Sequence, residues 1–110
     1  MNFGIPFKAI KAQAGAGNSN VIAATSGRTY HIVSITIGVS AHNETGTVLL
    51  DDGTTTLFGP FLMKDGNGHP PSAFFGEKGI SWGADKGMRV VVANGGTANV
   101  MVNGYYRDEN

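Results

Sequence analysis

Residues 28–39 read Arg-Thr-Tyr-His-Ile-Val-Ser-Ile-Thr-Ile-Gly-Val and form the longest β-favouring run of the chain. Branched and aromatic side chains dominate this run, and such side chains fit a pleated, half-buried surface. One set of alternating positions is apolar after its first member, so we expect it to face a core: His31, Val33, Ile35, Ile37 and Val39. The run therefore predicts the central strand of a sheet.

The other alternating set of the same run is Tyr30, Ile32, Ser34 and Thr36, which starts apolar and turns polar. We expect that face to be covered only at its start. Its polar half is then either wet or turned toward a neighbouring subunit. A strand with one wet face favours an antiparallel sheet over a parallel one covered by helices.

Shorter β-rich runs separated by turn residues fill the rest of the chain. We predict strands over residues 7–14, 21–25, 47–50, 54–58, 61–63, 73–75, 80–84, 88–93 and 97–106, and loops over residues 15–20 and 64–72. Asp52-Gly53 and Asn94-Gly95-Gly96 are typical of hairpin turns. A break at Gly59-Pro60 indicates an edge strand or a bulge. No segment predicts a helix over a strand.

This pattern predicts a single all-β domain, an antiparallel β-sandwich of eight or nine short strands. Eight strands in about a hundred residues suit a jelly roll, in which two four-stranded sheets face each other. We divide the chain into an N-terminal arm, residues 1–6, and a sandwich domain, residues 7–110. The arm carries the apolar side chains Phe3 and Ile5, which pack either on their own domain or on a neighbour.

The charge balance excludes several classes of partner. Eight basic and eight acidic residues cancel, so no global field attracts nucleic acid or an anionic membrane. Charged residues make up only 15% of the chain, below the usual quarter. Either part of the surface is hidden against a partner or sister subunit, or Asn, Thr and Ser carry it.

Other features of the sequence limit the cellular compartments in which we expect the protein. The start lacks the pattern of a signal peptide, and no stretch has the length of a membrane helix. We therefore expect a soluble protein made in a cytoplasm. The chain contains no cysteine, so disulfides and thiolate sites are excluded.

Enzymatic motifs fail when their context is considered. Residues 79–83, Gly-Ile-Ser-Trp-Gly, match the hydrolase nucleophile elbow, but no helix is predicted after Ser81 and no histidine follows it in the sequence. His31, His42 and His69 lie far apart, so we predict no metal site and no cofactor, and we interpret His31 as a hydrogen-bonded structural residue. We expect a protein that is not an enzyme.

Aromatic residues leave one binding alternative open. Trp82, Tyr30, Tyr105 and Tyr106 could stack on a sugar ring, or they could serve core and subunit packing. The first reading predicts a carbohydrate- or receptor-binding module, such as a domain of a virion fibre or tail. It requires an exposed aromatic pair with Asn and Asp nearby.

Residues 20–106 as a whole resemble the small β-sandwich virion proteins of tailed bacteriophages, especially head decoration (cement) proteins. The resemblance rests on Val-Ile-Ala-Ala-Thr-Ser-Gly-Arg-Thr-Tyr-His-Ile-Val-Ser, on the hairpin Thr-Val-Leu-Leu-Asp-Asp-Gly-Thr, on Phe-Gly-Glu-Lys-Gly-Ile-Ser-Trp and on Val-Met-Val-Asn-Gly-Tyr-Tyr. A Gly-Arg turn before the long strand and a terminal Gly-Tyr are similar to layouts in that group.

The resemblance implies a non-enzymatic subunit, often a trimer, that is bound to the lattice of the major capsid protein. It places the protein on the capsid surface of a virion, after synthesis in the host cytoplasm, with neither nucleic acid nor membrane as partner. Apolar arm residues and the long loop are the contacts that we expect with the capsid: Phe3, Ile5, Phe7, Asn67, His69 and Pro70.

Overall fold

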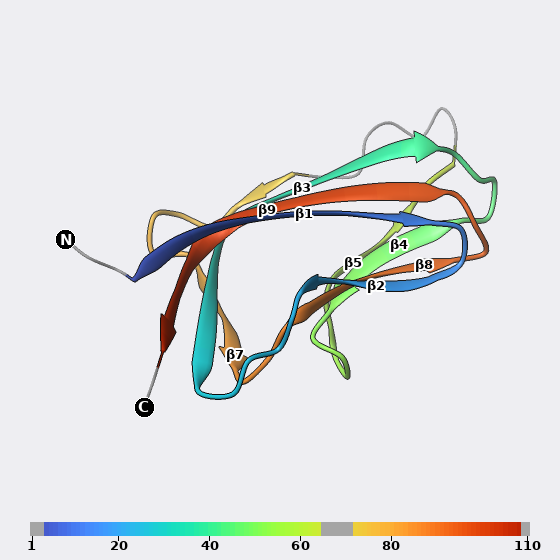
Figure 1. Ribbon diagram of the computed structural model, residues 1–110. Helices are drawn as coiled ribbons and strands as arrows, with labels where there is room; N and C mark the ends of the chain where they lie inside the picture. Colours follow the sequence, from blue (N-terminus) through green and yellow to red (C-terminus); the bar gives the residue numbers. More distant parts are fainter. Residues whose placement is uncertain (1–3, 65–71, 109–110) are drawn as a thin grey trace.

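The computed structural model describes residues 4–64 and 72–108, which form nine β-strands in two sheets (Figure 1). The strands are β1 (Ile5–Ala14), β2 (Gly17–Ile22), β3 (Arg28–Ala41), β4 (Thr47–Asp51), β5 (Thr56–Leu62), β6 (Ala73–Phe74), β7 (Ile80–Ala84), β8 (Met88–Ala93) and β9 (Thr97–Asp108). The part of the chain that is described contains no helix long and apolar enough to cross a membrane. The predicted all-β, antiparallel fold is confirmed.

The strand order is that of a jelly roll. One sheet has the order β1-β9-β3-β6, with β7 also paired to β3, and the other has the order β2-β8-β4-β5. Strands β6 and β7 pair with different parts of β3, at Ser34–Ile35 and at Thr29–Ile32. Counted as one interrupted strand, they give the eight-strand, two-sheet arrangement of the jelly roll. Counted separately, they give the first sheet five strands and the fold nine, within the eight or nine that we predicted.

The core lies between the two sheets and is built by alternation along the strands. Every second side chain of a strand points to the same face, so each sheet contributes one apolar set. The fully buried members include Ile32, Ile35, Val100 and Val102 from the five-stranded sheet and Val48, Leu50, Met88 and Val90 from the four-stranded sheet. These residues form one continuous hydrophobic cluster, to which Trp82 also belongs.

A β-bulge in β3 corrects the predicted inward set. Ile32 pairs with Gly104 of β9 and Ser34 pairs with the next residue, Asn103, so Val33 is an extra residue on β3. The bulge shifts the alternation by one position. Before it, Tyr30 and Ile32 face the core, and His31 lies on the outer face. After it, the predicted inward positions of Ile35 and Ile37 are confirmed, but Val33 is only half-buried.

Several predicted boundaries also change. Residues 15–20, predicted as a loop, mostly belong to β2, whose backbone pairs with β8. Strand β5 starts at Thr56 and runs through Gly59 and Pro60, and it is the edge strand that the proline indicated. Strand β1 starts at Ile5, whose Cα partner is Tyr106 of β9, so the end of the predicted arm lies in the sheet.

Candidate interaction surface

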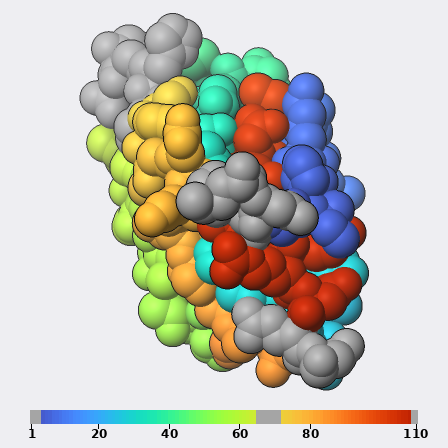
Figure 2. Space-filling view, turned by 90° about the vertical axis from the view of Figure 1, so that its left-hand side faces the viewer, coloured from blue at the N-terminus to red at the C-terminus, as the bar shows by residue number. Residues whose placement is uncertain are grey.

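The outer face of the five-stranded sheet carries its side chains in rows across the strands. One row joins Lys8 of β1, Asn103 of β9, Ser34 of β3 and Phe74 of β6 through consecutive pairings. Paired residues of neighbouring antiparallel strands point to the same face. Figure 2 shows β6, β3, β9 and β1 side by side in this order, from yellow to blue.

The adjoining row contains Ile10, Met101 and Thr36. Ile10 is 68% exposed and Phe74 is 71% exposed, the highest values among the large hydrophobic side chains that the structure describes. Met101 lies beside Ile10 and is half-buried. We call these two rows the five-strand face, which consists of Lys8, Ile10, Ser34, Thr36, Phe74, Met101 and Asn103.

Polar side chains near the apolar ones are paired along the sheet. The amide nitrogen Nδ2 of Asn103 donates a hydrogen bond to Oγ of Ser34, 3.2 Å away, and Asn99 Nδ2 donates to Ser40 Oγ over 3.0 Å. A polar group that already has a partner costs less free energy to cover than one that is left without a partner. The face combines exposed apolar side chains with polar groups that tolerate being covered.

The five-strand face carries positive but no negative charge. Lys8 is its only charged residue, and Arg107 lies further along β9 over the ring of Tyr105, 5.6 Å from its centroid. Carboxylates near the ends of the sheets are occupied within the domain: Asp108 pairs with Arg28 at 2.6 Å, and Asp85 accepts a hydrogen bond from the backbone N–H of Gly27. The bond to Arg28 lowers the pKa of Asp108.

The aromatic side chains near the start of β3 stack on one another. Tyr30 makes edge contacts with Phe7, 5.1 Å between ring centroids, and the ring of His31 lies flat on Tyr105 at 4.7 Å. Tyr106 lies beneath the guanidinium of Arg28, 3.9 Å from it. These contacts bury Tyr30 and Tyr105 and leave Tyr106 half-buried.

Trp82 is also enclosed. It is 3% exposed, and its indole N–H donates to the backbone oxygen of Gly87 over 2.7 Å. The four aromatic residues considered for a sugar site therefore pack within the domain and form no exposed pair.

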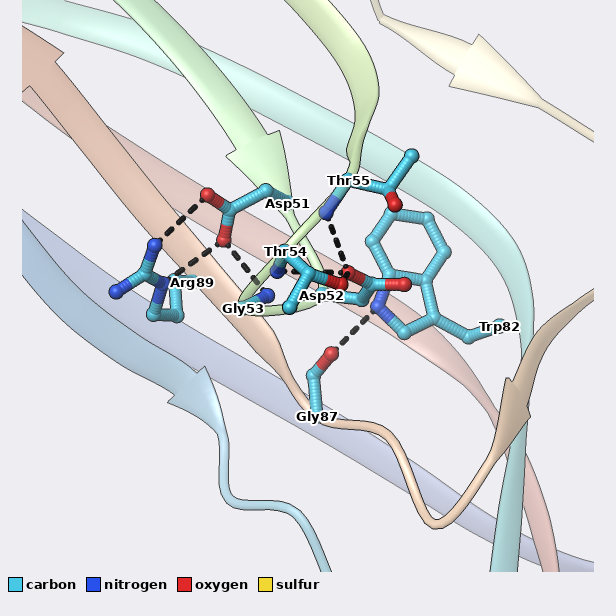
Figure 3. Close-up of polar contacts among 8 residues, drawn as sticks. All are labelled: Asp51, Asp52, Gly53, Thr54, Thr55, Trp82, Gly87 and Arg89. Carbon is cyan, nitrogen blue, oxygen red and sulfur yellow. Dashed lines mark hydrogen bonds and ion pairs between the residues drawn. The ribbon is translucent and has the colours of Figure 1, made fainter.

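A small pocket of about 200 Å³ opens beside the β4–β5 turn, lined in part by Asn20, Asp52, Gly53 and Arg89. Figure 3 shows how its polar groups are engaged. Asp52 accepts hydrogen bonds from the backbone N–H groups of Thr55 and Thr54, which lower its pKa. They close a turn over residues 52–55, longer than the two-residue hairpin turn that Asp52-Gly53 predicted. The carboxylate of Asp52 is used to shape the turn.

Asp51 and Arg89 form an ion pair across β4 and β8 on the outer side of the four-stranded sheet. The guanidinium donates from Nε to Oδ1 over 2.9 Å and from NH2 to Oδ2 over 3.0 Å. These hydrogen bonds lower the pKa of the Asp51 carboxyl. Because the folded pKa lies below the unfolded value of about 3.9, the pair stabilises the fold above that pH. The contribution is lost as the pH falls through the folded pKa.

Asp51→Asn is therefore expected to lower the melting temperature at pH 7 by roughly 5 °C, since it weakens a charge-assisted, two-point contact. The difference from the wild-type protein should shrink as the pH falls through the depressed pKa of Asp51. Thermal unfolding followed by circular dichroism between pH 7 and pH 2 measures this difference in melting temperature. Glu77→Gln, which neutralises an exposed carboxylate, is the control and should change little. A deficit of Asp51→Asn that persisted undiminished at pH 2 would contradict this role of the ion pair.

The structure agrees with the dismissal of the serine motif. Ser81 lies inside β7, paired with His31 of β3, and its hydroxyl oxygen accepts a hydrogen bond from Gly83 N–H at 3.4 Å. A nucleophile elbow requires a strand-to-helix turn, and here another strand follows. Within residues 4–64 and 72–108, no cluster of three or more His, Cys, Asp or Glu side chains is arranged to hold a metal ion.

The residues predicted to touch a capsid are only partly described. Phe3, Asn67, His69 and Pro70 lie outside the described residues. Ile5 is exposed at the start of β1. Phe7 is half-buried, packs against the core and meets Tyr30. The sequence reasoning missed Ile10, Met101 and Phe74, because only the pairing of β1, β9, β3 and β6 brings them to one face.

No protein-family model and no curated protein matches the chain. A solved structure does match: a chain of the cyanophage Pam1 capsid asymmetric unit, with a TM-score of 0.56 and 20% sequence identity. The match covers 96% of this chain and 88% of that chain. At this identity the likeness shows a shared fold, which extends over nearly the whole of both chains.

Proposed function

We propose that the chain is a non-enzymatic structural protein of a bacteriophage virion that binds the exterior of the capsid and stabilises its lattice. The observation that carries the proposal is the likeness of fold, over nearly the full length of both chains, to a chain of a phage capsid asymmetric unit. A decoration or cement protein needs no catalytic pocket. It needs surfaces that bury area at the joints between capsid subunits.

The surface properties of the domain support such a role. Its most exposed large hydrophobic side chains lie on a sheet face that has few charges, as at a protein–protein contact. The four aromatic residues considered for a sugar site make their contacts within the domain, which gives the receptor-binding alternative no support from them. Ser81 stands in a strand without the elbow that a hydrolase requires.

In this proposal the chain self-associates as a trimer, and its partner is the lattice of the major capsid protein. Three linked copies bind a symmetric lattice more tightly than one, since each contact raises the effective concentration of the next. Phe3, Ile5, Asn67, His69 and Pro70 remain proposed contacts. Phe7 acts indirectly, because its packing against Tyr30 holds β1 in the sheet.

Co-sedimentation tests this function. Capsids assembled without the chain, from the major capsid protein of the phage that encodes it, are mixed with the purified protein and pelleted. We expect saturable binding and a molecular mass of three chains by light scattering. Bound capsids should also resist heat or chelator treatment better than bare ones. A protein that stays in the supernatant at every concentration would refute the proposal.

A further inference from the structure

Resting on the proposed function, we infer that the five-strand face is the surface that docks on the capsid lattice, against a protein surface that presents carboxylates around apolar side chains. The face consists of Lys8, Ile10, Ser34, Thr36, Phe74, Met101 and Asn103, as defined above. Three properties of these residues carry the inference: exposed apolar area, paired polar groups and one sign of charge.

The degree of apolar exposure sets this face apart, because Ile10 and Phe74 are more exposed than Leu57 and Leu62 of β5. Ile10 and Phe74 stand on different strands of one sheet, with Met101 next to Ile10. Covering such a side chain removes apolar area from water, which favours binding. Ile10 and Phe74, which we call the anchors, can act together because the sheet holds both side chains in place before binding.

The polar groups between the anchors allow the face to be covered. Asn103 and Ser34 bond to each other between Lys8 and Phe74 in the same row. Both groups keep this partner when a second protein covers them, so covering them leaves fewer bonds unsatisfied. Few polar groups of the face therefore oppose docking.

The charge of the face favours a protein partner that presents carboxylates. Lys8 is the charged residue of the face, and no Asp or Glu stands on either row. A second copy of the same face would bring like charges together, whereas a partner with carboxylates would meet opposite charge. On the four-stranded sheet, the corresponding cation Arg89 is neutralised within the domain by Asp51. That sheet therefore offers no net charge with which to select such a partner.

Variants on each sheet separate this inference from other docking modes. Ile10→Glu and Phe74→Ser remove the anchors, and Lys8→Glu reverses the charge. Leu57→Glu is the matched control, because Leu57 is 44% exposed but lies on β5 of the other sheet. All four substitutions are made at exposed positions. The melting temperature and the oligomer mass of every variant are measured before its binding is compared.

Co-sedimentation with capsids that lack the chain, at two salt concentrations, gives the affinities. We expect Ile10→Glu and Phe74→Ser each to weaken binding by about tenfold, which corresponds to roughly 1.4 kcal/mol. Lys8→Glu should weaken binding mainly at low salt, where charges are less screened. Leu57→Glu should bind within about twofold of the wild-type protein.

Three outcomes would overturn the inference. If the anchor variants bound as the wild-type protein does while Leu57→Glu lost binding, the docking surface would lie on the other sheet. If Ile10→Glu folded but had a smaller oligomer mass, the face would meet a second copy of the chain. If the wild-type protein itself did not bind, the proposed function would fail and the docking surface with it.

Discussion

Ile32→Asp is expected to abolish the cooperative unfolding transition of the domain, whereas Val33→Asp, one position further along β3, should leave it in place. Ile32 is completely buried between the sheets, and an unpaired carboxylate there costs several kcal/mol of desolvation. Because total stabilities of such domains are only about 5–15 kcal/mol, this loss is large enough to unfold the domain. Val33 is the extra residue of the bulge and keeps part of its side chain in water.

Thermal unfolding followed by circular dichroism compares the two variants directly. Val33→Asp should retain a sigmoidal transition with a modest decrease in melting temperature. The outcome opposite to this one, an intact Ile32→Asp protein and an unfolded Val33→Asp protein, would mean that β3 alternates without a bulge. His31→Asp provides a second check of the direction in which β3 side chains point. His31 lies on the outer face beside Tyr105, so this variant should also retain a sigmoidal transition.

Gly104→Ala is expected to destabilise the domain by about 1–3 kcal/mol or more, as overpacked positions do, while Gly38→Ala should be neutral or slightly stabilising. A Cβ atom added at Gly104 would overlap the backbone oxygen of His31 and meet Cε1 of Phe7 at 3.1 Å. Strands β9 and β3 would have to separate to accommodate it. Around Gly38, on β3 of the same sheet, a Cβ atom would meet nothing within 4 Å.

Chemical denaturation in urea measures both glycine variants under the same conditions. The two substitutions add the same methyl group, so the difference between their unfolding free energies isolates the close approach of β9 to β3. Equal effects at the two positions would show that β9 and β3 lie further apart at Gly104 than they do in the structure.

The central strand illustrates how far sequence reasoning reaches. Alternation identified β3 and its inward positions Ile35 and Ile37, because a side-chain period of two is a direct property of the pleat. It failed at Val33, since an apolar residue is compatible with either face and a bulge has no composition of its own. The change from apolar Tyr30 and Ile32 to polar Ser34 and Thr36 within one alternating set is the trace that the bulge leaves in the sequence.

Strand β2 shows a second limit. Its residues 17–20, Gly-Asn-Ser-Asn, have low β-propensity and predicted a loop. These residues adopt a strand conformation because their backbone pairs with the apolar strand β8. This tertiary pairing outweighs their local preference for a loop. Such pairing cannot be deduced from residues that carry no apolar pattern.

The candidate surface was beyond the reach of local reasoning for a related reason. Ile10, Phe74 and Met101 lie far apart in the sequence and belong to three strands whose order only the topology fixes. The sparse charge left two readings open, a surface partly hidden against a partner or a surface carried by Asn, Thr and Ser. The pairing of β1, β9, β3 and β6 is needed to say which surface is the best candidate.

Virions of the phage that encodes the chain provide the most direct test of the proposed role. Cryo-electron microscopy of the capsid, combined with mass spectrometry of purified particles, is the measurement. Our account predicts density on the capsid exterior that fits this two-sheet domain in threefold groups, with the five-strand face toward the lattice. Virions that lack the chain, or that carry it only on the tail or fibres, would contradict it.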